Sequence, residues 1–210
     1  MEKFTYYLFD FDGTLFDTLK ANERVFIEAF RYIGIEIKKE DVLHYTRVPI
    51  PETFKKLGAP KEKWDIFGEH ILALVNDQTT IDMTNIYDDT YDTLLDLRLS
   101  EASLSIVTSN NVRHVKDILK KYAMGDLFFD VLVGNQEAPI PKPNPQPLNV
   151  ALEMLHYSGD RKDVAYIGDA MNDVLAAKAA GVQPILLDRH NEFKDSEEYI
   201  RIRSLKELLD

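Results

Sequence analysis

Two aspartates lie two residues apart where a short apolar run ends. Asp10 and Asp12 follow the run Phe4 to Phe9, and Gly13 comes directly after them. If the run is a β-strand, alternate side chains point to the same side, so the two carboxylates share one space. Like charges about 4 Å apart repel by on the order of 4 kcal/mol at an effective dielectric near 20, a large part of a typical stability of about 5–15 kcal/mol. The pair therefore predicts a compensating cation.

A second acidic group, in the sequence GDAMND, follows another strand-like run that ends at Ile167. Asp169 lies at the end of that run, and Asp173 lies one helical turn further on. Oxygen donors without sulfur or nitrogen suit Mg²⁺ better than zinc, and Mg²⁺ is often completed by phosphate oxygens of a substrate. We therefore expect Asp10 and Asp169 to share a magnesium ion, for which the backbone carbonyl of Asp12 can also serve as a ligand.

Hydroxyl and ammonium groups follow two further strand-like runs. Thr108 and Ser109 end the run that begins at Leu104, and a helical pattern opens just beyond them with backbone N–H groups that favour an anion. Lys142 lies between prolines in PIPKPNP, and these prolines restrict the backbone that presents its ammonium. Carboxylates, a metal ion, a hydroxyl and a lysine together predict a site for phosphoryl chemistry.

The elements that must position these residues alternate along the chain. Strand-like runs cover residues 4–9, 104–108, 129–134, 164–168 and 184–187, and helical patterns cover 112–122, 145–156 and 173–180. Short continuous apolar runs that alternate with helices predict an α/β fold with a parallel sheet covered on both faces. In such sheets ligands bind outside the carboxyl ends of the strands, which is where the candidate residues fall.

Residues 16–84 interrupt this alternation, since they contain two helical apolar stripes and no convincing strand. We read them as a small all-helical unit inserted after the first strand. The predicted division is therefore an α/β core domain of residues 1–15 and 85–210, with a helical cap domain of residues 16–84.

Composition restricts the partners. Acidic residues outnumber basic ones, 36 to 25, and the resulting charge of -11 argues against nucleic acid or an anionic membrane surface as the main partner. There is no cysteine, so a disulfide and a thiolate metal site are excluded. The apolar stretch near the N-terminus is too short for a signal peptide, and we expect a cytoplasmic protein. The acidic pair Asp88 and Asp89 is expected on a solvated face.

Four segments resemble the four motifs of the haloacid dehalogenase-like hydrolase superfamily. They are DFDGTLFDT, VTSN, KPNP and GDAMNDVLAAKAAG, and they occur in the order typical of that superfamily. The position of the helical insertion is similar to that in its phosphoglycolate phosphatase and β-phosphoglucomutase-like members, which carry a helical cap. The resemblance implies a Rossmann-like parallel sheet flanked by helices.

The resemblance also implies roles for individual residues. Asp10 would attack phosphorus and form an aspartyl phosphate, and Asp12 would act as the acid and base. Thr108 and Lys142 would complete the catalytic set by binding the transferring phosphoryl group. The metal set would be Asp10, Asp12, Asp169 and Asp173, where Asp173 either holds the ion, directly or through water, or orients Lys142.

The implied substrate-binding residues are Thr108, Ser109, Asn110, Lys142 and Arg47. Arg47 would extend from a loop of the cap as a clamp for phosphate or carboxylate, or it would form a surface salt bridge.

We expect a Mg²⁺-dependent phosphatase that hydrolyses a small phosphorylated metabolite and exists as a monomer or a weak homodimer. One alternative is a phosphomutase of the β-phosphoglucomutase type, which returns the phosphoryl group to a sugar. An alternative of another class is a phosphate-responsive regulatory protein, although such a module does not need the acid–base residue Asp12.

Overall fold

The computed structural model describes residues 3–46, 50–125 and 128–210. The chain forms two compact units, one of residues 1–17 and 86–210 and the other of residues 18–85. The boundaries expected from the sequence lie after residues 15 and 84, and the division into separate domains stays a prediction.

The larger unit is built on a six-stranded parallel sheet in the order β5-β4-β1-β6-β7-β8. Its strands are β1 (Tyr6–Phe9), β4 (Ser103–Val107), β5 (Val131–Val133), β6 (Val164–Gly168), β7 (Gln183–Leu187) and β8 (Ile200–Ile202). The last residue of β1, Phe9, lies opposite Ile106 of β4 and Ile167 of β6. The three central strands therefore end at nearly the same level, and the residues that follow them meet at one edge.

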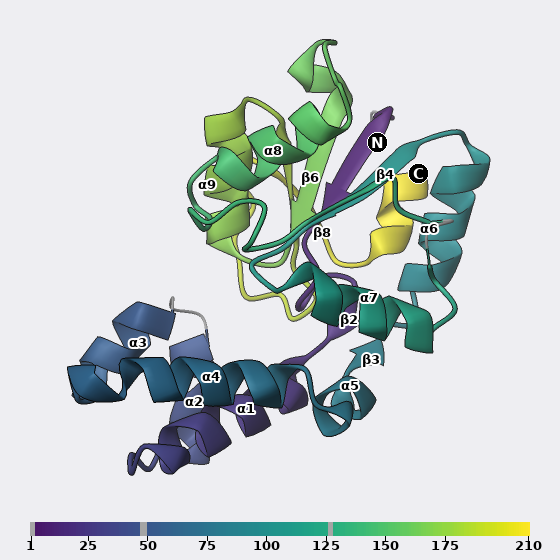
Figure 1. Ribbon diagram of the computed structural model, residues 1–210. Helices are drawn as coiled ribbons and strands as arrows, with labels where there is room; N and C mark the ends of the chain where they lie inside the picture. Colours follow the sequence, from purple (N-terminus) through teal and green to yellow (C-terminus); the bar gives the residue numbers. More distant parts are fainter. Residues whose placement is uncertain (1–2, 47–49, 126–127) are drawn as a thin grey trace. The chain divides into compact units, whose positions relative to one another are not determined.

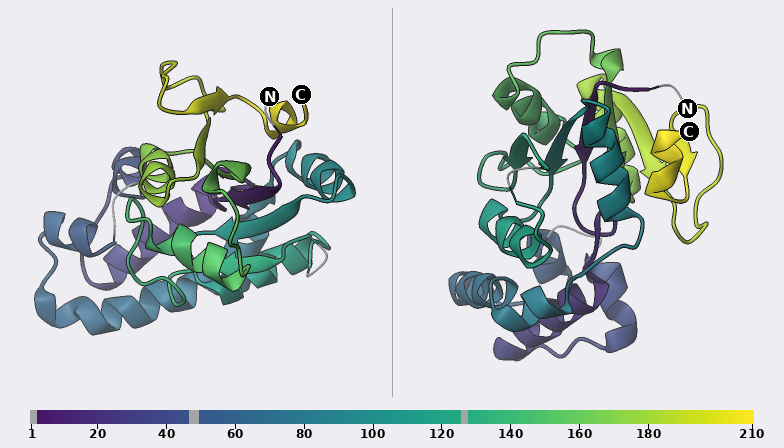
Figure 2. Two further views of the ribbon diagram at one scale, coloured as in Figure 1. Left: turned by 90° about the horizontal axis from the view of Figure 1, so that it is seen from above. Right: turned by 90° about the vertical axis from the view of Figure 1, so that its right-hand side faces the viewer.

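Helices cover both faces of this sheet. The helices α8 (Gln146–Met154) and α9 (Met171–Ala180) lie on one face, where their apolar residues pack on Leu8 and Tyr166. On the opposite face lie α6 (Thr90–Leu99) and the 3-10 helix η3 (Leu205–Leu209), as Figures 1 and 2 show. The remaining helices of this unit, among the residues that the structure describes, are α7 (Val112–Lys121) and the 3-10 helix η2 (Arg161–Asp163). The buried central strands agree with the apolar runs that predicted them.

The smaller unit contains helices with a core of its own. They are α1 (Leu19–Tyr32), α2 (Lys39–Thr46), α3 (Ile50–Lys56), the 3-10 helix η1 (Lys61–Lys63), α4 (Trp64–Val75) and α5 (Gln78–Met83). Phe30 of α1, Phe54 of α3 and Phe67 of α4 meet in this core, with the rings of Phe30 and Phe67 4.7 Å apart. The aromatic residues of the predicted helical stripes are thus packed against one another.

The structure confirms the α/β fold and the five predicted strands, with ends that agree to within two residues, and adds two features. The expectation that residues 16–84 contain no strand is wrong at its start, because β2 (Phe16–Asp17) pairs with β3 (Asn85–Ile86). The edge strand β8 was not predicted, since it has three residues and Arg201 lies in its middle. Its parallel pairing with β7 extends the sheet by one strand.

Candidate active site

Three aspartates gather at the carboxyl edge of the central strands. Asp10 follows β1, Asp169 follows β6, and Asp173 lies in the first turn of α9. One carboxylate oxygen from each of the three lies within 4.8 Å of the other two. Asp10 and Asp173 are buried, at 8% and 3% exposure, so water screens their mutual repulsion poorly. The structure therefore brings together the carboxylates that the sequence placed at two separate strand ends.

The electrostatics of this cluster reflect burial first and crowded negative charge second. Burial, together with Asp173, Asp169 and Asp12, raises the pKa of Asp10 well above its usual range, although the Lys142 ammonium acts in the opposite direction. Burial and the nearby Asp173 carboxylate raise the pKa of Asp169 to about 7. Both shifts mean that the protein alone does not fully compensate the charges of its ionised carboxylates.

Lys142 is the cation that the chain itself supplies to this cluster. Its Nζ lies 3.0 Å from Asp10 Oδ1 and 2.6 Å from Asp173 Oδ1. It also donates to the hydroxyl of Tyr166 at 2.8 Å. Burial opposes the charged form of Lys142, but Asp10 and Asp173 outweigh it and hold the pKa of the ammonium well above its usual range. Asp173 thus contacts Lys142 directly, as the orienting role considered for it requires, while its role in the site stays a prediction.

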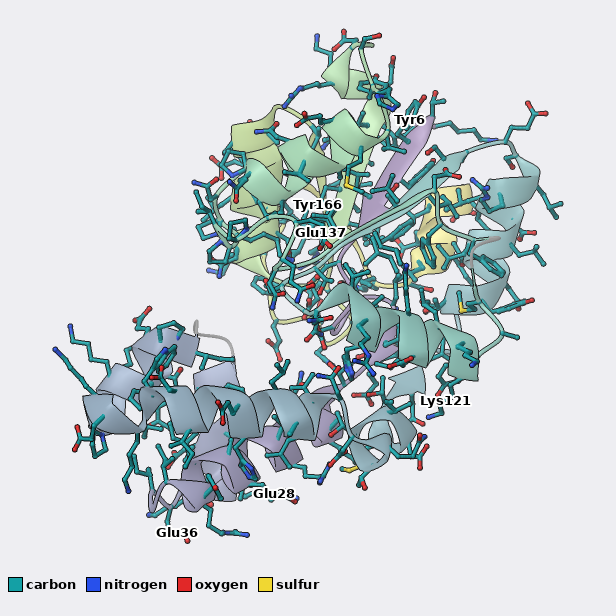
Figure 3. The ribbon with its side chains drawn as sticks, in the orientation of Figure 1. Tyr6, Glu28, Glu36, Lys121, Glu137 and Tyr166 are labelled. Carbon is teal, nitrogen blue, oxygen red and sulfur yellow. The ribbon has the colours of Figure 1, made fainter. Side chains whose placement is uncertain are left out.

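Sequence reasoning missed Tyr166, which is labelled in Figure 3 and lies on β6 in the interior of the larger unit. It is 1% exposed, and its hydroxyl donates to the backbone carbonyl of Val107 at 3.0 Å. In the sequence it is one apolar-looking residue of a buried strand. The one available signal was its place two residues before the GDAMND segment, because alternate residues of a strand share a face.

Asp12 is partly buried and faces a different partner. The amide of Asn110 donates to Asp12 Oδ2 at 2.5 Å, and the backbone N–H of Asn110 donates to Thr108 Oγ1 at 3.1 Å. The segment after β4 is therefore joined to the segment after β1 by a side-chain hydrogen bond. Thr108 is buried, whereas Ser109 is exposed. Arg47 lies outside the residues that the structure describes.

A tight turn at Gly13 brings the loop after β1 against Asp169. Gly13 has a φ of 72°, which favours glycine, and an added Cβ would overlap the Asp169 carboxylate. The hydroxyl of Thr14, the next residue, lies 3.5 Å from Asp169 Oδ1. Asp10, Asp169 and Asp173 thus offer carboxylate oxygens close together, and the backbone at Gly13 packs against the carboxylate of Asp169. Such a set of oxygen donors fits a hard divalent cation. Asp10 and Asp169 are the residues that would hold it.

The expectation that Asp89 belongs to a solvated face is wrong. Asp89 is 7% exposed, and Arg189 lies beside it with Nη1 2.9 Å from Asp89 Oδ2. Arg189 lies in the segment that follows β7, 100 residues after Asp89 in the chain. The local sequence around Asp89 therefore gave no sign of the pairing. A buried acidic residue of this kind requires a cation, and the chain supplies one.

Comparison with known proteins places the chain in a family. Residues 7–187 match the family model described as haloacid dehalogenase-like hydrolase, and the chain belongs to this family. It is 33% identical to pyrophosphatase PpaX of Bacillus velezensis, over 87% of this chain and 82% of that protein. It is 29% identical to phosphoglycolate phosphatase of Vibrio cholerae, over 82% of this chain and 79% of the relative. The protein is therefore a hydrolase.

A solved structure supports the fold. The haloacid dehalogenase-like family protein SP0104 of Streptococcus pneumoniae aligns with a TM-score of 0.79 and 21% identity, covering 98% of this chain and 97% of the other. Among the residues that the structure describes, none of the helices combines the length and apolar character needed to span a bilayer.

Proposed function

We propose that the protein is a Mg²⁺-dependent phosphatase that hydrolyses small phosphate monoesters or anhydrides through an aspartyl phosphate on Asp10. The observation that carries the proposal is the buried Asp10 carboxylate, which lies 3.0 Å from the Lys142 ammonium and beside Asp169 and Asp173. A carboxylate can approach an anionic phosphate only where positive charge is concentrated. The names of the relatives, a pyrophosphatase and a phosphoglycolate phosphatase, agree with phosphoryl chemistry.

Asp10 and Asp169 would hold the metal ion, which would neutralise negative charge on the transferring group when bound. Lys142, which pairs with Asp10, contributes the second positive charge. Its ammonium is held in position by Asp173 and Tyr166. Thr108, buried at the end of β4, would donate its hydroxyl to a phosphoryl oxygen.

In the first step, Asp10 would attack phosphorus while the bond from phosphorus to the leaving oxygen breaks, and Asp12 would give that oxygen a proton. In the second step, water would attack the aspartyl phosphate and lose a proton to Asp12. Inorganic phosphate would leave, and the Asp10 carboxylate would be restored. The hydrogen bond from Asn110 holds the Asp12 side chain in one orientation. This contact supports a role for Asn110 as the partner of Asp12 rather than as a ligand of the phosphate.

The test is phosphate release from a panel of metabolite phosphates that includes pyrophosphate and phosphoglycolate, measured with and without Mg²⁺. We expect Asp10→Asn to lose activity by a factor of at least about 10³, because the amide is a poor nucleophile and the covalent step is lost. Asp130→Asn is the matched control, since Asp130 pairs with Arg98 and contacts Ser103 and Leu104 at the start of β4. It should remain active.

Two results would contradict the proposal. Near-normal turnover by Asp10→Asn would exclude the covalent step. Interconversion of sugar phosphates without release of phosphate would favour the phosphomutase alternative.

A further inference from the structure

Arg189 and Asp89 form an ion pair with two parallel hydrogen bonds. Arg189 Nη1 donates to Asp89 Oδ2 at 2.9 Å, and Nη2 donates to Oδ1 at 2.9 Å. The two side chains are only 13% and 10% exposed. The guanidinium also lies over the ring of Tyr87, with its central carbon 3.9 Å from the ring centroid. A two-point contact combined with stacking fixes the plane of the guanidinium, a geometry that a lysine ammonium cannot reproduce.

Asp89 is itself held from the C-terminal part of the chain. Ser204 donates its hydroxyl to Asp89 Oδ2 at 2.7 Å, and the backbone N–H of Leu205 donates to the same oxygen at 2.9 Å. These bonds fix the carboxylate on which Arg189 rests. Burial raises the pKa of Asp89, but the hydrogen bonds from Arg189, Ser204 and Leu205 outweigh it and lower that pKa, so the carboxylate is ionised at neutral pH.

Arg189 reaches the turn that follows Asp10 and Asp12. Its Nη2 donates to the backbone carbonyl of Thr14 at 2.9 Å. The next carbonyl, that of Leu15, accepts from the Thr90 hydroxyl at 2.9 Å, and the carbonyl of Phe16 accepts from the N–H of Gly13 at 2.8 Å. Three consecutive carbonyls are thus satisfied, and the contacts to the first two, Thr14 and Leu15, come from other segments and hold the turn in place.

The turn in question is the one that touches Asp169. The backbone of Gly13 lies so close to that carboxylate that there is no room for a Cβ. Thr14 approaches the same carboxylate with its hydroxyl. We propose that Arg189 is a positioning residue for the metal site, because it holds the Gly13–Thr14 turn against Asp169. The proposal rests on the proposed function, since it assumes that Asp169 is a metal ligand.

A purely structural ion pair would explain the contact with Asp89 but not the bond to Thr14. The two interpretations differ in what a lysine at position 189 would do. A lysine keeps the charge and can still pair with Asp89, but its single nitrogen cannot replace the planar fork that serves Asp89 and the Thr14 carbonyl together. A structural role requires only the ion pair, whereas a positioning role requires the fork.

The experiment measures binding of Mn²⁺, an oxygen-preferring probe ion, by electron paramagnetic resonance in the absence of substrate. We expect Arg189→Lys to raise the Mn²⁺ dissociation constant about tenfold, as changes to the outer shell of a metal site typically do. The matched control is Arg98→Lys, because Arg98 also joins an aspartate, Asp130, to a backbone carbonyl, that of Ala102, at the start of β4. The control should lose stability but bind Mn²⁺ as the wild type does.

A second pair of variants keeps the test decisive if Arg189→Lys does not fold. Ser204→Ala removes one hydrogen bond to the Asp89 carboxylate and should weaken Mn²⁺ binding in the same direction, by a smaller factor. Arg189→Ala leaves space for added guanidinium, which should restore Mn²⁺ binding at millimolar concentrations.

The outcomes separate the two proposals. If folded Arg189→Lys binds Mn²⁺ with wild-type affinity, the positioning role is overturned and the proposed function stays intact. If the lysine variant does not fold, wild-type Mn²⁺ affinity in Ser204→Ala leads to the same conclusion. No binding of Mn²⁺ by the wild-type protein would remove both, because Asp169 would then not be a metal ligand.

Discussion

The ammonium of Lys142 has three N–H donors, and three oxygens lie around it. They belong to Asp10, Asp173 and Tyr166. Two of these oxygens carry charge, while the tyrosine hydroxyl in turn donates to the carbonyl of Val107. Since all three donors have a fixed acceptor, the nitrogen has a defined place beside Asp10 and needs little reorganisation when a phosphoryl group arrives.

Removing the hydroxyl of Tyr166 tests this arrangement. We expect Tyr166→Phe to lower kcat about tenfold, because the ring still fills the core while Lys142 loses one acceptor. The free energy of unfolding should fall by about 1–3 kcal/mol, since the Val107 carbonyl is left without its buried donor. Phosphate release and urea denaturation measure the two effects.

Tyr7→Phe is the control for this variant. Tyr7 lies in β1 with 2% exposure, and its hydroxyl accepts from the backbone N–H of Phe4, away from the carboxyl edge. It should cost stability without changing kcat. An equal loss of kcat in both variants would show that the hydroxyl of Tyr166 has no special role.

At the scale of elements, the site depends on the short turn that follows β1. This turn adopts a positive φ at Gly13 and approaches Asp169 so closely that only a hydrogen fits between them. The strand delivers Asp10 to the edge of the sheet, and the turn then returns toward the segment after β6. The aligned ends of β1 and β6 alone would bring Asp10 and Asp169 near one another. The turn adds the contacts of Gly13 and Thr14 with the Asp169 carboxylate.

Gly13→Ala is therefore expected to abolish Mn²⁺ binding and activity, because the new methyl group displaces the Asp169 carboxylate. The control is Gly181→Ala, at a residue with a φ of 74° that ends α9, where an added Cβ would come no closer than 3.7 Å to Arg161. Both variants should lose about 1 kcal/mol of stability from the unfavourable φ. Only the first should lose metal binding, as measured by electron paramagnetic resonance, and retained binding would show that the turn can adjust.

The sequence was sufficient for those parts of the site that follow strands directly. Asp10, Thr108 and Asp169 each come after an apolar run, and parallel strands with aligned ends bring such residues together. Tyr166 and Asp89 were not predicted, because their partners lie 24 and 100 residues away in sequence. Asp89 lies in the segment NIYDDTYD, in which a buried acid cannot be told from a solvated one without knowing where Arg189 lies. Side-chain pairing across long separations is the information that local patterns lack.

At the scale of the whole molecule, each unit has its own apolar core and its own ionic contacts. In the helical unit Arg24 of α1 pairs with Asp77, with Nη2 2.6 Å from Asp77 Oδ2, and it also donates to Thr80 at 2.9 Å. Hydrogen bonds from Arg24 lower the pKa of Asp77 to about 2, against the effect of burial. This contact joins the start of α5 to α1.

The Asp77 shift predicts a pH-dependent contribution to stability. Because the pKa is lower in the folded state, the contribution is complete above about pH 4, where an unfolded aspartate is ionised, and is lost as the pH falls toward 2. Asp77 is partly exposed, so solvent screening reduces the expected contribution to about 1 kcal/mol. Asp77→Asn should lower the free energy of unfolding by this amount at pH 7, while asparagine still serves as the N-cap of α5.

Urea denaturation between pH 7 and pH 2 provides the measurement. The difference between wild type and Asp77→Asn should close as the pH falls below 4. Glu36→Gln is the control, because Glu36 pairs with Arg31 at 3.6 Å on an exposed surface and should matter little at any pH. A constant difference for Asp77→Asn across the whole range would exclude the ionic explanation.

The strand order has a consequence for how the polypeptide matures during synthesis. Strand β1 lies in the middle of the sheet, and its two neighbours follow it along the chain only at Ser103 and Val164. Residues 18–85, by contrast, make their core from segments close in sequence, and such local contacts form fast. One side of β1 therefore stays unpaired in the nascent chain until Ser103 and the residues after it have been made, and the other side until the segment that begins at Val164 follows.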